Sequence, residues 1–183
     1  MGRKTTAYLA YVCASPSTIS DSLPDGYELK IWVPRFVHFV APTLGFISVI
    51  WSVFHFCRIF TNGHFRVVYI YQGNKIVHRS CVFPPHFRLP FMSENDLQIG
   101  ATWTEPAFRG KGLASSALAN ITRTMADKDR HFWYITRAAN GPSIRACQRA
   151  GFEFLCRLKR TSLGGFPLMG LYSFMTDNMG KTD

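Results

Sequence analysis

The chain has 183 residues, of which 17% are charged and 15% aromatic, and its formal net charge is +10. This composition excludes an intrinsically disordered chain, and the length allows one domain with a buried core, which we expect to span residues 1–183. The positive charge favours an anionic partner. It leaves open nucleic acid, a phosphorylated cofactor and an acidic membrane surface.

The cysteines and histidines give no sign of a disulfide framework or of a metal site. The five cysteines lie singly along the chain, and the six histidines form no HxH or HxxxH pair. An odd number of isolated cysteines fits reduced thiols, so we expect a cytoplasmic protein without a metal site.

The first half of the chain predicts strands around one apolar segment. Residues 27–33, YELKIWV, alternate as a strand does, and residues 66–82 predict a hairpin around a Gly-Asn turn. Residues 97–104, LQIGATWT, predict a further strand that ends before Pro106.

The second half alternates helices and strands. A helix is predicted over residues 112–125, because Ala114, Leu118, Ile121 and Met125 fall on one helical face. This order predicts an α+β fold, with a central mixed sheet flanked by helices on both faces. The remaining predicted elements are a strand over 131–136, a short helix over 142–150, and closing strands over 152–159 and 167–175.

The apolar segment 36–57 contains no Lys, Arg, Asp or Glu, and its length reaches the ~20 residues of a spanning helix. Three alternatives are open: ordinary buried helices, peripheral membrane contact and a true span. Pro42 should break a helix here, which leaves residues 43–60, ~27 Å long, short of a ~30 Å hydrocarbon core. We therefore expect a helical segment over 36–60 that folds against the sheet and leaves part of its aromatic surface exposed.

The stretch FRGKGLASSAL connects a predicted strand to a predicted helix. The first N–H groups of a helix have no partner inside it, and the helix dipole is positive there. Gly110 and Gly112 would let a ligand approach the backbone, while Arg109 and Lys111 add positive charge. This turn predicts a pyrophosphate site, although a solvated tight turn remains an alternative. It is no Walker A loop, and a dinucleotide fingerprint fails at Ser115.

Two segments resemble signatures of the GNAT acetyltransferase superfamily. EPAFRGKGLASSAL is similar to its R/Q-x-x-G-x-G/A motif, and NGPSIRACQRAGFEF is similar to its segment that runs from an Asn through a helix to Gly-Phe. The resemblance covers residues 67–154. The stretch DLQIGATWTEPAFRGKGLA further resembles GNAT proteins associated with bacterial surface-sugar biosynthesis. The residues that meet the two signatures are Arg109, Gly112 and Ala114 in the first, and Asn140, Ser143, Gly151 and Phe152 in the second.

The resemblance implies a GNAT-like acyl-CoA N-acyltransferase fold and acetyl-CoA as cofactor. Main-chain N–H groups of the turn would bind the pyrophosphate, and the end of the preceding strand would pair with the pantetheine arm. Asn140 and Ser143 would hydrogen-bond the same arm. The implied cofactor residues are Trp103, Thr104, Arg109, Gly110, Lys111, Gly112, Leu113, Ala114, Asn140 and Ser143.

The catalytic groups depart from the family pattern. The family's usual general acid is a tyrosine in the helix after Asn140, and Cys147 holds that position; packing is the alternative role for this thiol. Gln98 stands where histone-type members carry a glutamate base, and an amide cannot act as a base. We rank His78 and Asp96 first as bases, and a water relay is an alternative. Glu94, Glu105 and His86 are further nearby groups.

Three functions follow from this pattern. The first is transfer of acetyl from acetyl-CoA to the amine of a small-molecule acceptor, for example an amino sugar. The second is a membrane-associated acyltransferase, peripheral at the inner membrane face through residues 36–57, that acts on a lipid-linked acceptor. A non-enzymatic nucleic-acid binder comes last, because the basic residues are dispersed, so no nucleic-acid partner is expected. A homodimer is compatible with all of this.

Overall fold

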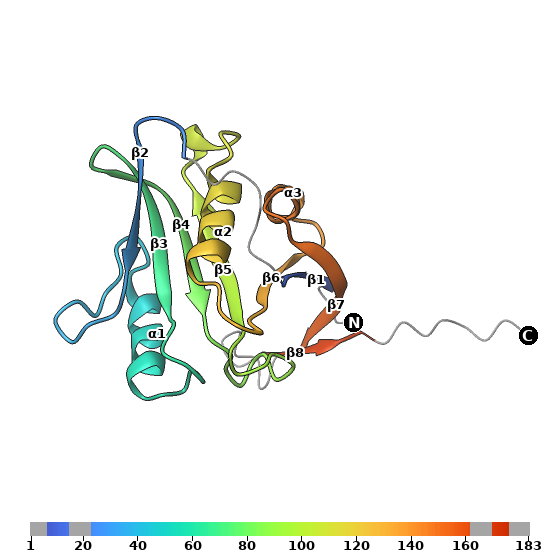
Figure 1. Cartoon of the computed structure of the whole chain (residues 1–183). Helices are drawn as coiled ribbons and strands as arrows, with labels where there is room; N and C mark the ends of the chain where they lie inside the picture. Colours follow the sequence, from blue (N-terminus) through green and yellow to red (C-terminus); the bar gives the residue numbers. More distant parts are fainter. Residues whose placement is uncertain (1–6, 15–22, 162–169, 176–183) are drawn as a thin grey trace, which may run out of the picture.

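The computed structural model describes residues 7–14, 23–161 and 170–175. Within them, eight strands form one sheet in the order β2-β3-β4-β5-β6-β1-β7-β8, and three helices pack on it (Figure 1). The architecture is α+β with a central mixed sheet. The strands are β1 (Ala7–Cys13), β2 (Tyr27–Trp32), β3 (Arg66–Gln72), β4 (Lys75–Phe83), β5 (Leu97–Thr104), β6 (Phe132–Arg137), β7 (Glu153–Thr161) and β8 (Leu171–Phe174); the helices are α1 (Phe46–Phe56), α2 (Leu113–Thr124) and α3 (Gly141–Arg149).

Helices cover both faces of the sheet. Successive residues of the β3–β4 hairpin point to opposite faces and are buried on both, so each face needs a cover. Val68 and Ile70 of β3 belong to the clusters that α2 completes. Val67 and Tyr69, one position along, pack with residues of α1 on the opposite face. The hairpin predicted over 66–82 is confirmed, and so is β5 over its full predicted length.

The sheet divides between β5 and β6. These two parallel strands pair only from Leu97 to Ile99, although β5 continues to Thr104 along β4 and β6 continues along β1. Beyond Ile99 the register of β5 against β4 shifts, so that Ala101 and Thr102 together face Ser80. Ala101 has φ 48°, a left-handed conformation that is unusual for a residue with a side chain. The bulge therefore lies where the two strands separate.

Strand β1 was not predicted from the sequence. It lies between β6 and β7 and pairs antiparallel with both. Tyr11 and Cys13 are buried in one cluster, and Tyr8 and Ala10 in another. A strand that is buried on both faces lacks polar alternation, so AYLAYVC reads only as a short apolar run.

The helix in the apolar segment is shorter than expected. It covers only Phe46–Phe56, 11 residues or roughly 16 Å. The chain before it folds back on the helix, because Ser48 Oγ accepts the N–H of Ala41 at 3.1 Å and Ser52 Oγ donates to the carbonyl of Phe39 at 2.8 Å. None of the described helices has the length and apolarity of a membrane span.

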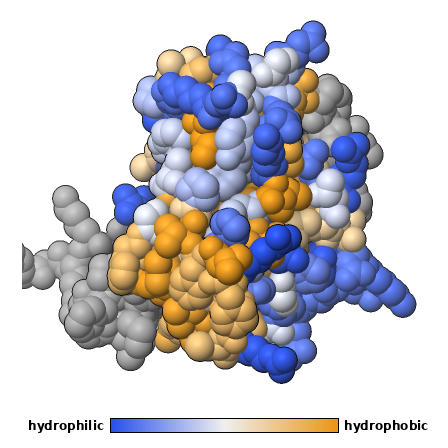
Figure 2. Space-filling view, turned by 90° about the vertical axis from the view of Figure 1, so that its left-hand side faces the viewer, coloured by the Kyte–Doolittle hydropathy of each residue, from blue (hydrophilic) through white to orange (hydrophobic). Residues whose placement is uncertain are grey.

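The exposed aromatic surface expected for this segment is present. Phe36 is 85% exposed, Val37 83% and Phe46 78%. Figure 2 shows the hydrophobic surface on the side of the molecule that carries α1. At the other end of the chain, the closing strand predicted over 167–175 is β8, and residues 167–169 lie outside the described part.

Candidate active site

The turn before α2 forms an open cradle of main-chain N–H groups. Gly110 has φ 80° and Gly112, the N-cap, has φ 78°, so both adopt the left-handed conformation that glycine tolerates. No side chain caps the helix, and its first turn contains no acidic residue. No atom lies within 4 Å of the position that a Cβ would take at either glycine. An anion can therefore approach the first N–H groups of α2.

Cations surround this cradle on two sides. Arg109 donates from Nε to the carbonyl of Thr104 at 3.2 Å, and the ammonium of Lys111 lies 4.9 Å from the centre of the Phe108 ring. From the facing helix α3, Arg145 and Arg149 line the same hollow of about 290 Å³. These two arginines were not among the residues predicted from the sequence. Their spacing of four residues, which places both on one face of a helix, was the available signal.

A second hollow of about 340 Å³ occupies the gap between β5 and β6. Asn140 caps α3 here, since its Oδ1 accepts the N–H of Ser143 at 3.4 Å. Lys111 lies in the turn but lines neither hollow. The structure brings the other residues predicted to bind the cofactor into one or both hollows: Trp103, Thr104, Arg109, Gly110, Gly112, Leu113, Ala114, Asn140 and Ser143.

Tyr134 of β6 also lines the hollow between the strands, and sequence reasoning missed it. The side chain is buried, and burial raises the pKa of its hydroxyl, while hydrogen bonds with Ser143 and Thr102 act in the opposite direction. Its position inside an aromatic strand, HFWYIT, predicts a core residue, so only the opening of the sheet beside β6 identifies it as part of the site.

His78 is linked to the same hollow by a chain of hydroxyl groups. Its Nδ1 lies 2.7 Å from Thr104 Oγ1, and its Nε2 lies 3.0 Å from Ser80 Oγ. Ser80 Oγ lies 3.2 Å from Thr102 Oγ1, and Thr102 hydrogen-bonds Tyr134. His78 is fully buried, and burial lowers the pKa of its imidazole to about 4, so the ring is neutral at pH 7.

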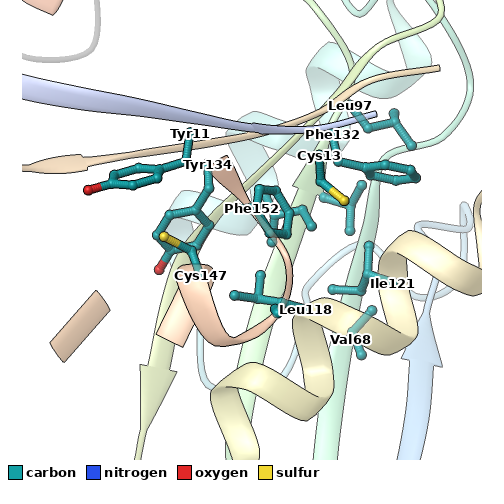
Figure 3. Close-up of a cluster of buried hydrophobic side chains, with 13 residues drawn as sticks. Tyr11, Cys13, Val68, Leu97, Leu118, Ile121, Phe132, Tyr134, Cys147 and Phe152 are labelled. Atoms are coloured by element: carbon teal, nitrogen blue, oxygen red, sulfur yellow. The ribbon is translucent and has the colours of Figure 1, made fainter. Parts of the chain in front are cut away.

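Cys147 does not line any of the hollows described here. Its thiol is fully buried and donates to the carbonyl of Ile144 at 3.2 Å, and burial raises its pKa to about 12. Figure 3 shows it within the hydrophobic cluster that includes Tyr11, Tyr134 and Phe152. The arrangement is that of a packing residue, the alternative named for this thiol.

Asp96 lies just before the start of β5, at the end remote from Thr104. One carboxylate oxygen accepts Trp133 Nε1 at 2.8 Å and the N–H of Ser93 at 3.0 Å, and the other accepts the N–H of His131 at 3.1 Å. These bonds tie the start of β5 to β6. The structure therefore does not bring Asp96 to the opening between the strands.

The opposite face of the sheet contains a larger cavity of about 440 Å³ between α1 and the strands. Gly100 and Ala101 form part of its wall, so it adjoins the bulge of β5 from the side of α1. His86 also lines it, and its Nδ1 lies 3.2 Å from the carbonyl of Pro84. Burial lowers the pKa of His86, and the nearby Arg88 lowers it further. The wall is otherwise mostly apolar, with Ile50, Trp51, Phe54, Phe60, Phe83, Phe87, Leu89, Ile135 and Tyr172.

The geometry thus joins an anion cradle, an opened pair of strands and an apolar cavity at one bulge. Within the described residues, no three His, Cys, Asp or Glu side chains lie close enough to hold a metal ion. One face of the sheet therefore offers a cationic cradle that suits an anion, and the other face offers a mostly apolar cavity.

Comparison with known sequences agrees with this arrangement. A profile of the Acetyltransferase (GNAT) family matches residues 30–152, about two thirds of the chain. The chain belongs to the GNAT acetyltransferase family. A search among functionally curated proteins finds no match.

Solved structures show the same fold at low sequence identity. A GCN5-related N-acetyltransferase from Sphaerobacter thermophilus is 14% identical, with a TM-score of 0.60 over 86% of this chain and 51% of the other. A GNAT-family acetyltransferase from Colwellia psychrerythraea is 16% identical, with a TM-score of 0.53 over 84% of this chain and 54% of the other. A tandem GNAT protein from the clavulanic acid biosynthesis pathway is 13% identical, with a TM-score of 0.57 over 86% and 53%. The chain therefore spans about half the length of each of these proteins.

Proposed function

We propose that the protein transfers the acetyl group of acetyl-CoA to the amine of a small-molecule acceptor. The observation that carries this proposal is the separation of β5 from β6 beyond Ile99, with the cationic cradle on one side and the apolar cavity on the other. The separation lets two molecules meet within the sheet without displacing a core residue.

The residues present fit acetyl-CoA. The Gly110–Gly112 turn and the start of α2 would hold the pyrophosphate, with Arg145 and Arg149 opposite. The main chain at Trp103 and Thr104, which has no partner from β6, would pair with the pantetheine arm, and Asn140 and Ser143 would bind it from α3. When bound, this cofactor supplies an acetyl group as a thioester, which an amine can attack.

The bulge of β5 supplies a main-chain donor at the reaction point. Since Ala101 and Thr102 together face Ser80, the β4–β5 ladder pairs neither of them in its regular register. An N–H from this bulge, fixed by the left-handed Ala101, would stabilise negative charge on the carbonyl oxygen under attack.

Tyr134 is the general acid of this proposal, in place of Cys147. Its raised pKa keeps the hydroxyl protonated at neutral pH, and it lines the hollow that would hold the thioester. After it donates a proton to the leaving thiolate, the hydroxyls of Thr102 and Ser143 would stabilise the phenolate, and solvent in the hollow would return the proton. His78 would orient this chain of hydroxyl groups through Ser80. His78 then acts through Tyr134, without touching the acceptor.

His86 is the general base of this proposal. Its Nδ1 faces the carbonyl of Pro84, which fixes the proton on that nitrogen and leaves the lone pair on Nε2. Its lowered pKa keeps the ring neutral at pH 7, so it can accept a proton from the attacking amine in the cavity that it lines. Asp96 does not lie at this opening, and a catalytic role for it stays a prediction from sequence alone.

The experiment is a thiol-release assay with acetyl-CoA against amino-sugar nucleotides, free amino sugars, amino acids, polyamines and peptides, with acetyl-CoA binding measured in parallel by calorimetry. We expect binding of acetyl-CoA and acetylation of at least one amine class. Binding without transfer to any amine, or the absence of binding, would refute the proposal. An amino-sugar acceptor, as the sequence suggests, is supported by the aromatic wall, because aromatic rings stack on sugar rings.

A second candidate is an acyltransferase that meets its acceptor at a membrane. The side chains of Phe36, Val37 and Phe46 are exposed. Two exposed cations flank this segment in the chain, Arg35 directly before Phe36 and Arg58 just after α1. Figure 2 shows the hydrophobic surface on the side that carries α1. We call Phe36, Val37, Val40 and Phe46 the α1 patch. An apolar patch rimmed with cations fits the surface of an anionic bilayer, and α1 also lines the acceptor cavity.

Vesicle flotation tests this second candidate. We expect the protein to float with vesicles that contain phosphatidylglycerol and not with neutral phosphatidylcholine vesicles. Replacing Phe36 and Phe46 together by Ser should abolish flotation, whereas Phe154→Ser, at a 53% exposed position on β7, should not. If the double variant floats as the wild type does, the α1 patch is not a membrane contact.

A further inference from the structure

The cavity on the α1 face has a strongly apolar wall. Its apolar groups come from both sides of the cavity, among them Trp51 and Phe54 of α1, Phe83 of β4 and Ile135 of β6. Its volume of about 440 Å³ lies in the range of small-molecule sites. An acceptor with an apolar body therefore suits this wall, because a fully polar one would lose its hydration and find few neutral side-chain partners, Gln98 and His86 among them.

One cation, Arg88, enters this apolar wall. Its Nε donates to the carbonyl of Gly170 at 3.1 Å, and its guanidinium carbon lies 5.7 Å from the centre of the Tyr172 ring. The Arg88 side chain is half-buried, and this partial removal from water lowers its pKa. A second cation, Arg160, lies 5.8 Å from the same ring.

Within the described residues, no carboxylate balances this positive charge. No Asp or Glu lines the cavity, and no ion pair of the described residues includes Arg88 or Arg160. Among the described residues, the side-chain partner of Arg88 is the neutral Tyr172, so its charge has no carboxylate partner there. A guanidinium binds a carboxylate through two parallel hydrogen bonds. A polyamine or a polycationic sugar would find no acid here for its additional ammonium groups.

We infer that the acceptor is an amine with an apolar body and a carboxylate, and that Arg88 binds that carboxylate. This inference rests on the proposed function and names the acceptor class of the same site. The amine must reach the wall formed by Gly100 and Ala101, where the cavity adjoins the opening between β5 and β6, while Arg88 fixes the remainder of the molecule. A neutral amino sugar would leave the half-buried cation without a partner.

Kinetics with matched acceptors test the inference. Phenylalanine and para-aminomethylbenzoate are each compared with their primary amides in the thiol-release assay. For at least one of the two pairs we expect kcat/KM for the acid to exceed that for the amide about tenfold, the effect of one charge-assisted hydrogen-bonded pair. The amide of phenylalanine has the less basic amine, hence more neutral nucleophile at pH 7, so a preference for the acid must come from its carboxylate. The inference is overturned if the acids react no faster than their amides while neutral sugars or polyamines are acetylated. That result would leave the acetyltransferase proposal intact.

A binding measurement that requires no turnover completes the test. Hydrocinnamate and hydrocinnamamide, which lack the amine, are titrated by calorimetry into the wild type, Arg88→Gln and Arg157→Gln; Arg157 is an exposed arginine on β7 that lines no hollow described here. We expect the acid to bind about tenfold more tightly than the amide in the wild type and in Arg157→Gln, and this difference to vanish in Arg88→Gln. Equal binding of acid and amide to the wild type, or a preference that survives in Arg88→Gln, overturns the role of Arg88. Failure of acetyl-CoA to bind would instead refute the proposed function.

Discussion

The Nε2 atom of His78 lies 3.0 Å from the hydroxyl of Ser80, two residues along the same strand. The other ring nitrogen lies 2.7 Å from Thr104 Oγ1 on the neighbouring strand, so both nitrogens are satisfied by hydroxyl groups. A neutral imidazole suits this pair of partners, because it donates one bond and accepts the other, whereas an imidazolium could only donate.

The first prediction concerns stability below neutral pH. The pKa of His78 is lowered to about 4 in the folded protein, against about 6.5 in the unfolded chain, so the unfolded state binds the proton first. The contribution is fully present above pH 6.5, and the free energy of unfolding should fall by about 1 kcal/mol per pH unit between pH 6.5 and pH 4. Urea unfolding of the wild type and of His78→Asn at several pH values measures this dependence. If the free energy of unfolding falls equally steeply with pH in both proteins, His78 is not its cause.

The second prediction is that Tyr134→Phe lowers kcat about 100-fold and leaves the Kd of acetyl-CoA nearly unchanged. Phenylalanine keeps the ring in the core and removes only the proposed proton donor. Tyr11→Phe, in the same buried cluster and lining no hollow described here, is the matched control and should retain activity. Equal kcat values for both variants would exclude Tyr134 as the acid.

The third prediction concerns the pH profile. His86 must be neutral to accept a proton, and its pKa is lowered, so kcat should decline only as the pH falls through a value below 6.5. In His86→Gln this acidic limb should disappear, together with most of the rate. An unchanged limb in that variant would assign the titration to another group.

The fourth prediction is that Gly112→Val weakens acetyl-CoA binding at least about tenfold, because a side chain there strains the left-handed backbone and crowds the approach of the pyrophosphate. Gly73→Val is the control, since Gly73 also has a positive φ, 56°, and open space around it, but lies in the β3–β4 turn. It should lose stability and retain cofactor affinity. Calorimetry with Gly112→Val that gives the wild-type Kd would displace the cofactor site from this turn.

The fifth prediction concerns Arg149 of α3. Arg149→Gln should weaken binding of acetyl-CoA about tenfold and reduce the salt dependence of its Kd, because one cation facing the cradle is lost. Arg123→Gln, on α2 outside the hollow, is the control. A similar Kd for both variants at low salt would show that Arg149 does not face the bound phosphates.

The turn that we propose for the cofactor could be located from the sequence because its signals are local. Arg109, Gly110 and Gly112 are neighbours in the chain, and the strand before them and the helix after them were both visible in the hydrophobic pattern. The length of β5 agrees with its prediction residue for residue, since Pro106 ends it.

The arrangement around Tyr134 could not be predicted, because it depends on the register of β5 against β4 and on the separation of β5 from β6. The contact of Ser80 with Thr102 requires the bulge that places two residues of β5 opposite one of β4. Tyr134 becomes a site residue only because β5 leaves β6 after Ile99. Neither the bulge nor the separation of the strands has a signature in the order of the residues. The sequence therefore indicates Asp96 by its nearness to β5 in the chain, and Cys147 by its position in the family pattern.

The placement of β1 has a consequence for biosynthesis. Its residues leave the ribosome before those of β2–β5, but both of its partners, β6 and β7, are synthesised only after β5. Until then Ala10 and Tyr11, which end up buried, have no strand on either side. The second half of the sheet can therefore close only after β7 has been synthesised, through contacts of very long sequence separation, which fold slowly. The nascent chain should depend on a chaperone that shields this apolar strand while the β2–β5 half is already able to form.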